Sequence, residues 1–90
     1  MTDLRVVNIR REPYDVYIGR GSMFGNPFPI TKEHTRQMVI DWYREWFYDQ
    51  LRIPEFREAV ENLRGKRLGC YCKPAQCHGD IIVEFLENTE

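Results

Sequence analysis

Short apolar segments near the start of the chain predict two strands. The segments LRVVNIR (4–10) and DVYIGR (15–20) are rich in β-branched residues, and only the connection REPY and its neighbours separate them. Because the connection is short, we expect the two strands to lie next to each other in one sheet. The following segment, 19–29, holds three glycines and two prolines, which predicts a structured loop.

A helical spacing of apolar residues begins after this loop. Thr31 and Thr35 are both suitable N-cap residues for such a helix, because a threonine hydroxyl can accept a backbone N–H of the first turn. The residues that follow repeat at intervals of three and four, which predicts one apolar face. That face comprises Val39, Trp42, Tyr43, Trp46, Phe47 and Leu51.

Three further elements complete the predicted order. Pro54 suits the first turn of a second helix, and Gly65 suits its end. The segment KRLGCYC (66–72) has the composition of a strand that Pro74 ends, and a final helix is expected over about residues 77–87. The predicted order is therefore strand, strand, helix, helix, strand, helix.

This order predicts a small α/β fold, with helices packed on a Rossmann-like sheet of three or slightly more strands. We expect the strands at 15–20 and 66–72 to be parallel and joined by a right-handed crossover, because two helices lie between them. Ninety residues are enough for one small core, so residues 1–90 are expected to form a single domain.

Composition and charge narrow the function. A formal net charge of −1, from 13 basic and 14 acidic residues, gives no overall attraction for nucleic acid. The sequence has neither a long apolar span nor the apolar core of a signal peptide, and three cysteines do not fit a secreted disulfide scaffold. These features predict a cytoplasmic protein, located in the host cytoplasm if a phage encodes it, without contact to a membrane.

The segment CYCKPAQCHGD (70–80) is the first candidate site, because it should form a strand-to-helix turn. Free N–H groups at a helix start bind anions, and Lys73 could add a positive charge. A thiol there should have a lowered pKa, so Cys77 is the candidate nucleophile, with His78 and Asp80 as candidates for proton transfer. The alternative is that Cys77 is a small buried core residue.

The loop YIGRGSMFGNPF (17–28) is the second candidate. Its glycines, Gly21 among them, allow the backbone to approach a ligand closely. Arg20 offers a planar fork for phosphate or carboxylate, and Asn26 could orient a ligand through its amide. It could instead be only a structured turn-rich loop. We expect both segments at one edge of the sheet, so that Arg20 and His78 face a shared hollow.

Zinc is an alternative use of the cysteine segment. Cys70, Cys72, Cys77 and His78 could supply the four ligands of a structural site. Their spacing, C-x-C-x4-C-H, departs from the usual zinc knuckle, and neighbouring Cys and His ligands are geometrically awkward. We therefore expect, in the first place, that this segment binds no metal.

The strings VVNIRREPYDVYIGRGSMFGNPF and LRGKRLGCYCKPAQCHGDIIVEFLE together resemble the phage and bacterial family known as domain of unknown function 4326. The last segment is also similar to a motif of domain of unknown function 488. These resemblances indicate which residues form the shared motifs, but they do not indicate a reaction. The resemblance implies a Rossmann-like unit with a polar cleft holding Arg20, Asn26, Cys72, Lys73, Cys77, His78 and Asp80.

The sequence favours a domain that binds a small phosphorylated molecule, such as a nucleotide or nucleoside, in a cleft between the two segments. Arg20 and Lys73 would bind the anion, and whether a reaction follows is open. One alternative is a phage protein–protein interaction module with structural cysteines. Another is a zinc-stabilised nucleic-acid-binding module. The aromatic residues at 43–48 are compatible with a homodimer, and the sequence does not identify whether a cofactor binds.

Overall fold

The computed structural model describes residues 4–73 and 75–89, and its element order is the predicted one. Pro74, expected to end the third strand, lies outside the described residues. The elements are β1 (Arg5–Asn8), β2 (Val16–Tyr17), α1 (Arg36–Gln50), α2 (Pro54–Glu61), β3 (Arg67–Cys70) and α3 (Gly79–Asn88). The small α/β fold is therefore confirmed for the described part of the chain.

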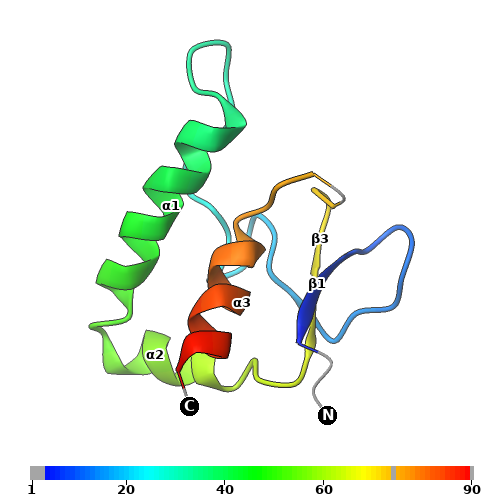
Figure 1. The fold of residues 1–90 in the computed structure, drawn as a ribbon, viewed down its shortest axis with the longest axis vertical. Coiled ribbons are helices and arrows are strands. Elements are labelled where there is room, and N and C mark those ends of the chain that lie inside the picture. The colour runs from blue at the N-terminus through cyan, green and yellow to red at the C-terminus, as the bar shows by residue number, and fades with distance from the viewer. Residues whose placement is uncertain (1–3, 74, 90) are drawn as a thin grey trace.

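The three strands form a parallel sheet in the order β1-β3-β2, and Figure 1 shows β1 beside β3. The predicted parallel pairing of β2 with β3 is confirmed, but the predicted pairing of β1 with β2 is wrong. The reason lies in the connection 9–15, which runs back along β3. The Ile9 N–H donates to the Cys70 carbonyl at one end of β3, and the Asp15 N–H donates to the Arg67 carbonyl at the other. β3 therefore lies between the other two strands.

Helix α1 is the longest element and extends along one side of the molecule (Figure 1). The Thr35 hydroxyl accepts the Met38 N–H, so Thr35 and not Thr31 caps the helix. The predicted apolar face is largely buried, although Trp42 and Trp46 remain partly exposed. Among the described residues, no helix has both the length and the apolar character needed to cross a membrane.

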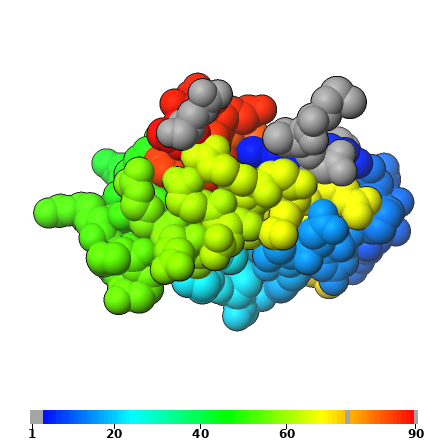
Figure 2. All heavy atoms as spheres, turned by 90° about the horizontal axis from the view of Figure 1, so that it is seen from below, coloured from blue at the N-terminus to red at the C-terminus, as the bar shows by residue number. Residues whose placement is uncertain are grey.

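Helices α2 and α3 close the core from the other sides. Pro54 occupies the start of α2, as expected, and Gly65 adopts a φ of 76° after the helix ends. Figure 2 shows residues 54–66, in yellow-green, between α1 and the N-terminal strands. Helix α3 buries its predicted apolar residues, which are Ile81, Ile82, Phe85 and Leu86.

Aromatic rings fill the centre of the core. Phe47 of α1 is fully buried, and its ring contacts those of Tyr43, Phe56 and Phe85 with centroid separations of 5.8 Å each. These contacts join α1, α2 and α3 through one side chain. The helices are thus held together by a single aromatic cluster.

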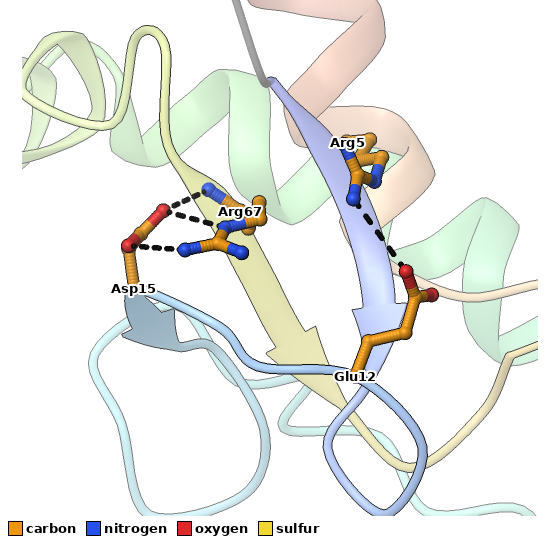
Figure 3. A network of polar contacts seen from close by, with 4 residues as sticks. All are labelled: Arg5, Glu12, Asp15 and Arg67. Atoms are coloured by element: carbon orange, nitrogen blue, oxygen red, sulfur yellow. Dashed lines mark hydrogen bonds and ion pairs between the residues drawn. The ribbon is translucent and has the colours of Figure 1, made fainter.

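An ion pair secures the short strand β2 to β3 (Figure 3). The Asp15 carboxylate accepts hydrogen bonds from the Arg67 backbone N–H at 2.8 Å, from Nε at 3.2 Å and from Nη2 at 3.3 Å. These hydrogen bonds to the Arg67 side chain and backbone lower the pKa of Asp15 below its usual value. A second pair, Arg5 with Glu12, spans the connection after β1 at 3.5 Å.

We expect Asp15→Asn to destabilise the domain in a pH-dependent manner. Because the folded-state pKa of Asp15 is lowered, its contribution is present above the unfolded-state pKa of 3.8 and is lost as the pH falls through the folded-state pKa. Urea unfolding should show a stability gap between wild type and variant near pH 7 that narrows as the pH falls below 3.8. Glu12→Gln is the control, since its exposed pair contributes little. An Asp15→Asn gap that is constant across this range contradicts the prediction.

Candidate functional site

A cavity of about 280 Å³ lies between the loop that follows β2 and the turn that follows β3. The start of α1 forms a third wall. Arg20 and His78, which are far apart in the sequence, both line this cavity, as do Asn26, Cys72 and Cys77. Most of the lining surface is apolar, and Arg36 supplies a second guanidinium. The structure therefore brings the two predicted segments together around one hollow.

The loop after β2 is attached to α1 by hydrogen bonds. The buried Tyr43 hydroxyl donates to the Phe24 carbonyl at 2.7 Å, and the Asn26 amide nitrogen donates to the Val39 carbonyl at 3.1 Å. The Asn26 side-chain oxygen accepts the Phe28 N–H at 2.8 Å. Both ends of the Asn26 amide are thus used within the protein. These hydrogen bonds shape the loop, and because Asn26 also lines the cavity, its role in orienting a ligand stays a prediction.

The loop also needs glycine for a close backbone approach. A Cβ atom on Gly25 would lie 2.6 Å from the Gly19 carbonyl oxygen and 3.3 Å from the Arg20 Cα. Gly21 adopts a φ of 91°, which favours glycine, and it is not among the residues that line the cavity, so its contact with a ligand stays a prediction. The close approach of Gly25 to Gly19 therefore fixes the backbone position of Arg20.

Asn8, at the end of β1, holds the turn after β3. Its amide nitrogen donates to the Lys73 carbonyl at 2.7 Å and to the Tyr71 carbonyl at 3.3 Å. Sequence reasoning missed this residue. The available signal was a lone amide in the apolar segment VVNI, at a strand end where side chains often serve neighbouring loops. Asn8 thereby positions the backbone on both sides of Cys72.

The three cysteine thiols form one cluster beside the cavity. Cys70 and Cys77 are each 1% exposed, and their Sγ atoms are 2.9 Å apart. Cys72 is partly exposed, and the three Sγ atoms all lie within 4.8 Å of one another. The Gly79 N–H donates to the Cys77 Sγ at 3.4 Å. Three sulfur atoms at this spacing could hold a metal ion.

The thiols differ in acidity because they share hydrogen bonds. The contact with Cys70, and then that with Cys77, lowers the pKa of Cys72, and Arg36 acts in the same direction. The contacts with Cys70 and Cys72, together with burial, raise the pKa of Cys77. The expectation that a helix start lowers the pKa of Cys77 is therefore wrong. Cys72 is the more acidic and the more accessible thiol.

His78 is buried at the base of the cavity, with 7% of its surface exposed. Its Nε2 lies 2.7 Å from the Ile18 carbonyl, and its Nδ1 lies 3.6 Å from the Cys77 Sγ. A carbonyl only accepts, so Nε2 carries the proton and Nδ1 faces the thiol. Burial lowers the pKa of His78, which keeps the ring neutral at pH 7. Its ring nitrogens are not part of the thiol cluster that could hold a metal, contrary to the four-ligand zinc alternative.

Lys73 and Asp80 lie outside the cavity. The Lys73 ammonium pairs with the Asp80 carboxylate at 2.6 Å, and both residues line a separate surface groove beside β1 and α3. Asp80 also accepts the Cys77 backbone N–H at 3.1 Å. A carboxylate of the protein itself thus occupies part of the helix start that the sequence suggested for an anion. Asp80 stabilises the turn here, and it does not share the hollow with His78.

Two guanidinium groups border the cavity from different elements. Arg36, at the start of α1, donates from Nη1 to the Gln76 carbonyl at 3.0 Å, which links α1 to the cysteine turn. Arg20 donates from Nη1 to the Asn26 carbonyl at 3.3 Å. The aromatic rings of Tyr17, Phe28 and Tyr71 lie along the same cavity. From the sequence, Arg36 could face an anion in the same cleft, but a solvated position is favoured. The sequence does not select the three rings, because only the folded chain brings them together.

Comparison with known proteins gives two matches. The model of a family described as "Domain of unknown function (DUF4326)" matches residues 4–88. An "Uncharacterized 12.4 kDa protein in nrdA-td intergenic region" of Enterobacteria phage T4 is 40% identical over 83 residues, which cover 91% of this chain and 76% of the phage protein. No solved structure matches the chain, so the Rossmann-like description of its sheet stays a prediction.

Proposed function

The chain belongs to the family described as Domain of unknown function (DUF4326), and we propose that this domain binds a phosphate-bearing small molecule of mononucleotide size. The binding site is the cavity between the loop after β2 and the turn after β3. The observation that carries the proposal is the position of Arg20 and Arg36, which come from separate elements and border one apolar hollow.

The charged side of the cavity suits a phosphate group. Each guanidinium has five N–H donors in a planar fork. The one backbone hydrogen bond from each Nη1 uses only one of them, so other donors remain for a ligand. Two such groups at one cavity would bind a dianion from two directions. Lys73 is not part of this binding set, because it is paired with Asp80 in another groove.

The apolar side of the cavity suits a flat ring. Tyr17 and Tyr71 pack edge to face with centroids 6.3 Å apart. Phe28, from the loop after β2, lines the same cavity. Aromatic side chains are common partners of nucleobases because every base offers a flat face for stacking. The volume of about 280 Å³ is at the small end of ligand sites, which favours a mononucleotide over a dinucleotide.

Charge elsewhere on the domain does not favour a nucleic-acid polymer as the ligand. The net charge is −1, and two of the three basic residues at positions 64–67 form ion pairs. Arg64 pairs with Glu61 at 2.8 Å, and Arg67 pairs with Asp15 at 3.2 Å. The proposal also places the domain in a reducing host cytoplasm, where its thiols persist, in keeping with its phage T4 relative.

A thermal-shift panel tests the proposal. The panel contains inorganic phosphate, ribose 5-phosphate, the nucleosides and the nucleoside monophosphates. We expect at least one monophosphate to stabilise the protein more than phosphate or nucleoside alone does. A concentration of about 100 times Kd should stabilise by about 2.7 kcal/mol, which raises Tm by about 10 to 20 °C for a domain of this size.

Arg36→Gln and Arg20→Gln identify the site. Each change should weaken binding of the monophosphate roughly 10- to 100-fold by calorimetry, because it removes hydrogen bonds to a charged group. Arg52→Gln is the matched control, because Arg52 is exposed just beyond the end of α1. Within the described part of the chain, its ion pair is with Asp49. If no compound stabilises the domain, or if all three variants bind as wild type does, the proposal is rejected.

A further inference from the structure

The thiol cluster has the composition and spacing of a metal site. We propose that Cys70, Cys72 and Cys77 bind one Zn²⁺ ion through three thiolates, with the fourth coordination position open to the cavity. The three Sγ atoms lie within 4.8 Å of one another although the residues span a turn between β3 and α3. This assignment does not depend on the proposed ligand, because it uses only the sulfur atoms.

The donor set fits zinc or another thiophilic ion. Thiolates select soft metals such as Zn²⁺ and Cu⁺ over Mg²⁺ and Ca²⁺. At a Zn–S distance of about 2.3 Å, tetrahedral geometry separates two sulfurs by about 3.8 Å. The Cys70 and Cys77 Sγ atoms, 2.9 Å apart, must therefore separate by about 1 Å on binding. Cys72, which lies after the end of β3 and is partly exposed, closes the third side.

The surroundings meet the further needs of such a site. The Gly79 N–H bonds the Cys77 Sγ at 3.4 Å, a contact that favours a charged sulfur. Asn8 and Asp80 hold the turn on both sides of the cluster through bonds to its backbone. The Arg36 guanidinium lines the same cavity as Cys72, so a positive charge lies near the net negative charge of a zinc trithiolate.

The open fourth position follows from the placement of His78. Its Nε2 donates to the Ile18 carbonyl at 2.7 Å, and its Nδ1, although 3.6 Å from the Cys77 Sγ, is not within the 4.8 Å spacing that the three thiols share. All three cysteines line the cavity, which gives the ion both an entry path and a neighbouring site for an incoming ligand. Three protein ligands with one open position is the arrangement of zinc sites that bind a further molecule, whereas structural sites have four protein ligands.

The test uses the whole reduced chain, with phosphine reductant present so that no disulfide forms, and Zn²⁺ alone as the probe. Competition against a chromophoric chelator should give about one Zn²⁺ per chain. Co²⁺ in its place should give thiolate-to-metal charge-transfer absorption. Losing a hydrogen bond to a metal-binding side chain weakens metal affinity roughly 10- to 100-fold. Cys72→Ser removes a metal-binding thiol itself, so it should weaken Zn²⁺ binding by at least that factor. Ala75→Ser, in the same turn and exposed, is the control and should bind as wild type does.

Alkylation provides a second readout that does not require Cys70 or Cys77 to be changed. Mass spectrometry should show that Zn²⁺ protects Cys72 from iodoacetamide in the wild-type chain and leaves labelling of side chains outside the three-cysteine cluster unaltered. The proposal is overturned if Zn²⁺ binds no more tightly to wild type than to Cys72→Ser, or if labelling of Cys72 is the same with and without the ion. Either result leaves nucleotide binding untouched, since no nucleotide is present.

Discussion

Phe47→Ala is expected to remove a large share of the free energy of unfolding of the domain at 25 °C. The Phe47 side chain is completely buried, and its ring contacts three others that come from α1, α2 and α3. Removing a buried phenylalanine costs about 3–5 kcal/mol, because the apolar surface is lost and the cavity closes only in part. A domain of this size has a total stability of only about 5–15 kcal/mol.

Urea unfolding followed by tryptophan fluorescence measures this loss. The unfolding midpoint of Phe47→Ala should fall by at least about a fifth of the wild-type value, or the variant should be unfolded without urea. The neighbouring substitution Tyr48→Ala is the control, since Tyr48 is 42% exposed and should cost much less. Equal midpoints for the two variants would show that the aromatic cluster is not the centre of the core.

Gly25→Ala is expected both to destabilise the domain and to remove ligand binding. The new Cβ would lie 2.6 Å from the Gly19 carbonyl oxygen and 3.1 Å from its carbonyl carbon, so it would contact backbone that no rotamer change can move. Crowding of this kind costs about 1–3 kcal/mol. The two arms of the loop must separate, which displaces Arg20 from the cavity.

A second glycine separates these two effects. Gly65 has a φ of 76°, and a Cβ at this position would have no neighbouring atom within 4 Å, so Gly65→Ala is strained but does not touch the loop. Both variants should lose stability in urea, of the order of 1 kcal/mol or more. Only Gly25→Ala should lose affinity for the monophosphate, by about 10-fold or more, in calorimetry. Normal affinity in folded Gly25→Ala would show that the crossing of the loop arms does not shape the site.

Local patterns were sufficient to predict the elements. The spacing of apolar residues located α1, Pro54 located the start of α2, and Gly65 located the end of that helix region. The order of strands was not accessible in the same way. A short connection suggested a hairpin, whereas hydrogen bonds from Ile9 and Asp15 to opposite ends of β3 make that connection run back along the strand. Strand pairing depends on such long-range contacts, which a local pattern does not contain.

The candidate site was predicted in outline and not in its details. The convergence of Arg20 and His78 follows from two loops that leave parallel neighbouring strands at the same edge. The orientation of side chains within the turn does not follow from spacing. The Cys77 side chain points inward against Cys70. The Asp80 carboxylate accepts the Cys77 backbone N–H and pairs with Lys73. These orientations decide which thiol is accessible and which charges face the cavity.

The most direct measurement is a crystal structure of the reduced domain bound to the nucleoside monophosphate that raises Tm most. We expect phosphate oxygens at about 2.7–3.2 Å from the guanidinium nitrogens of both Arg20 and Arg36, with the base against Tyr17 and Phe28. A nucleotide bound at any other surface, or a phosphate that contacts neither arginine, would contradict the proposed site.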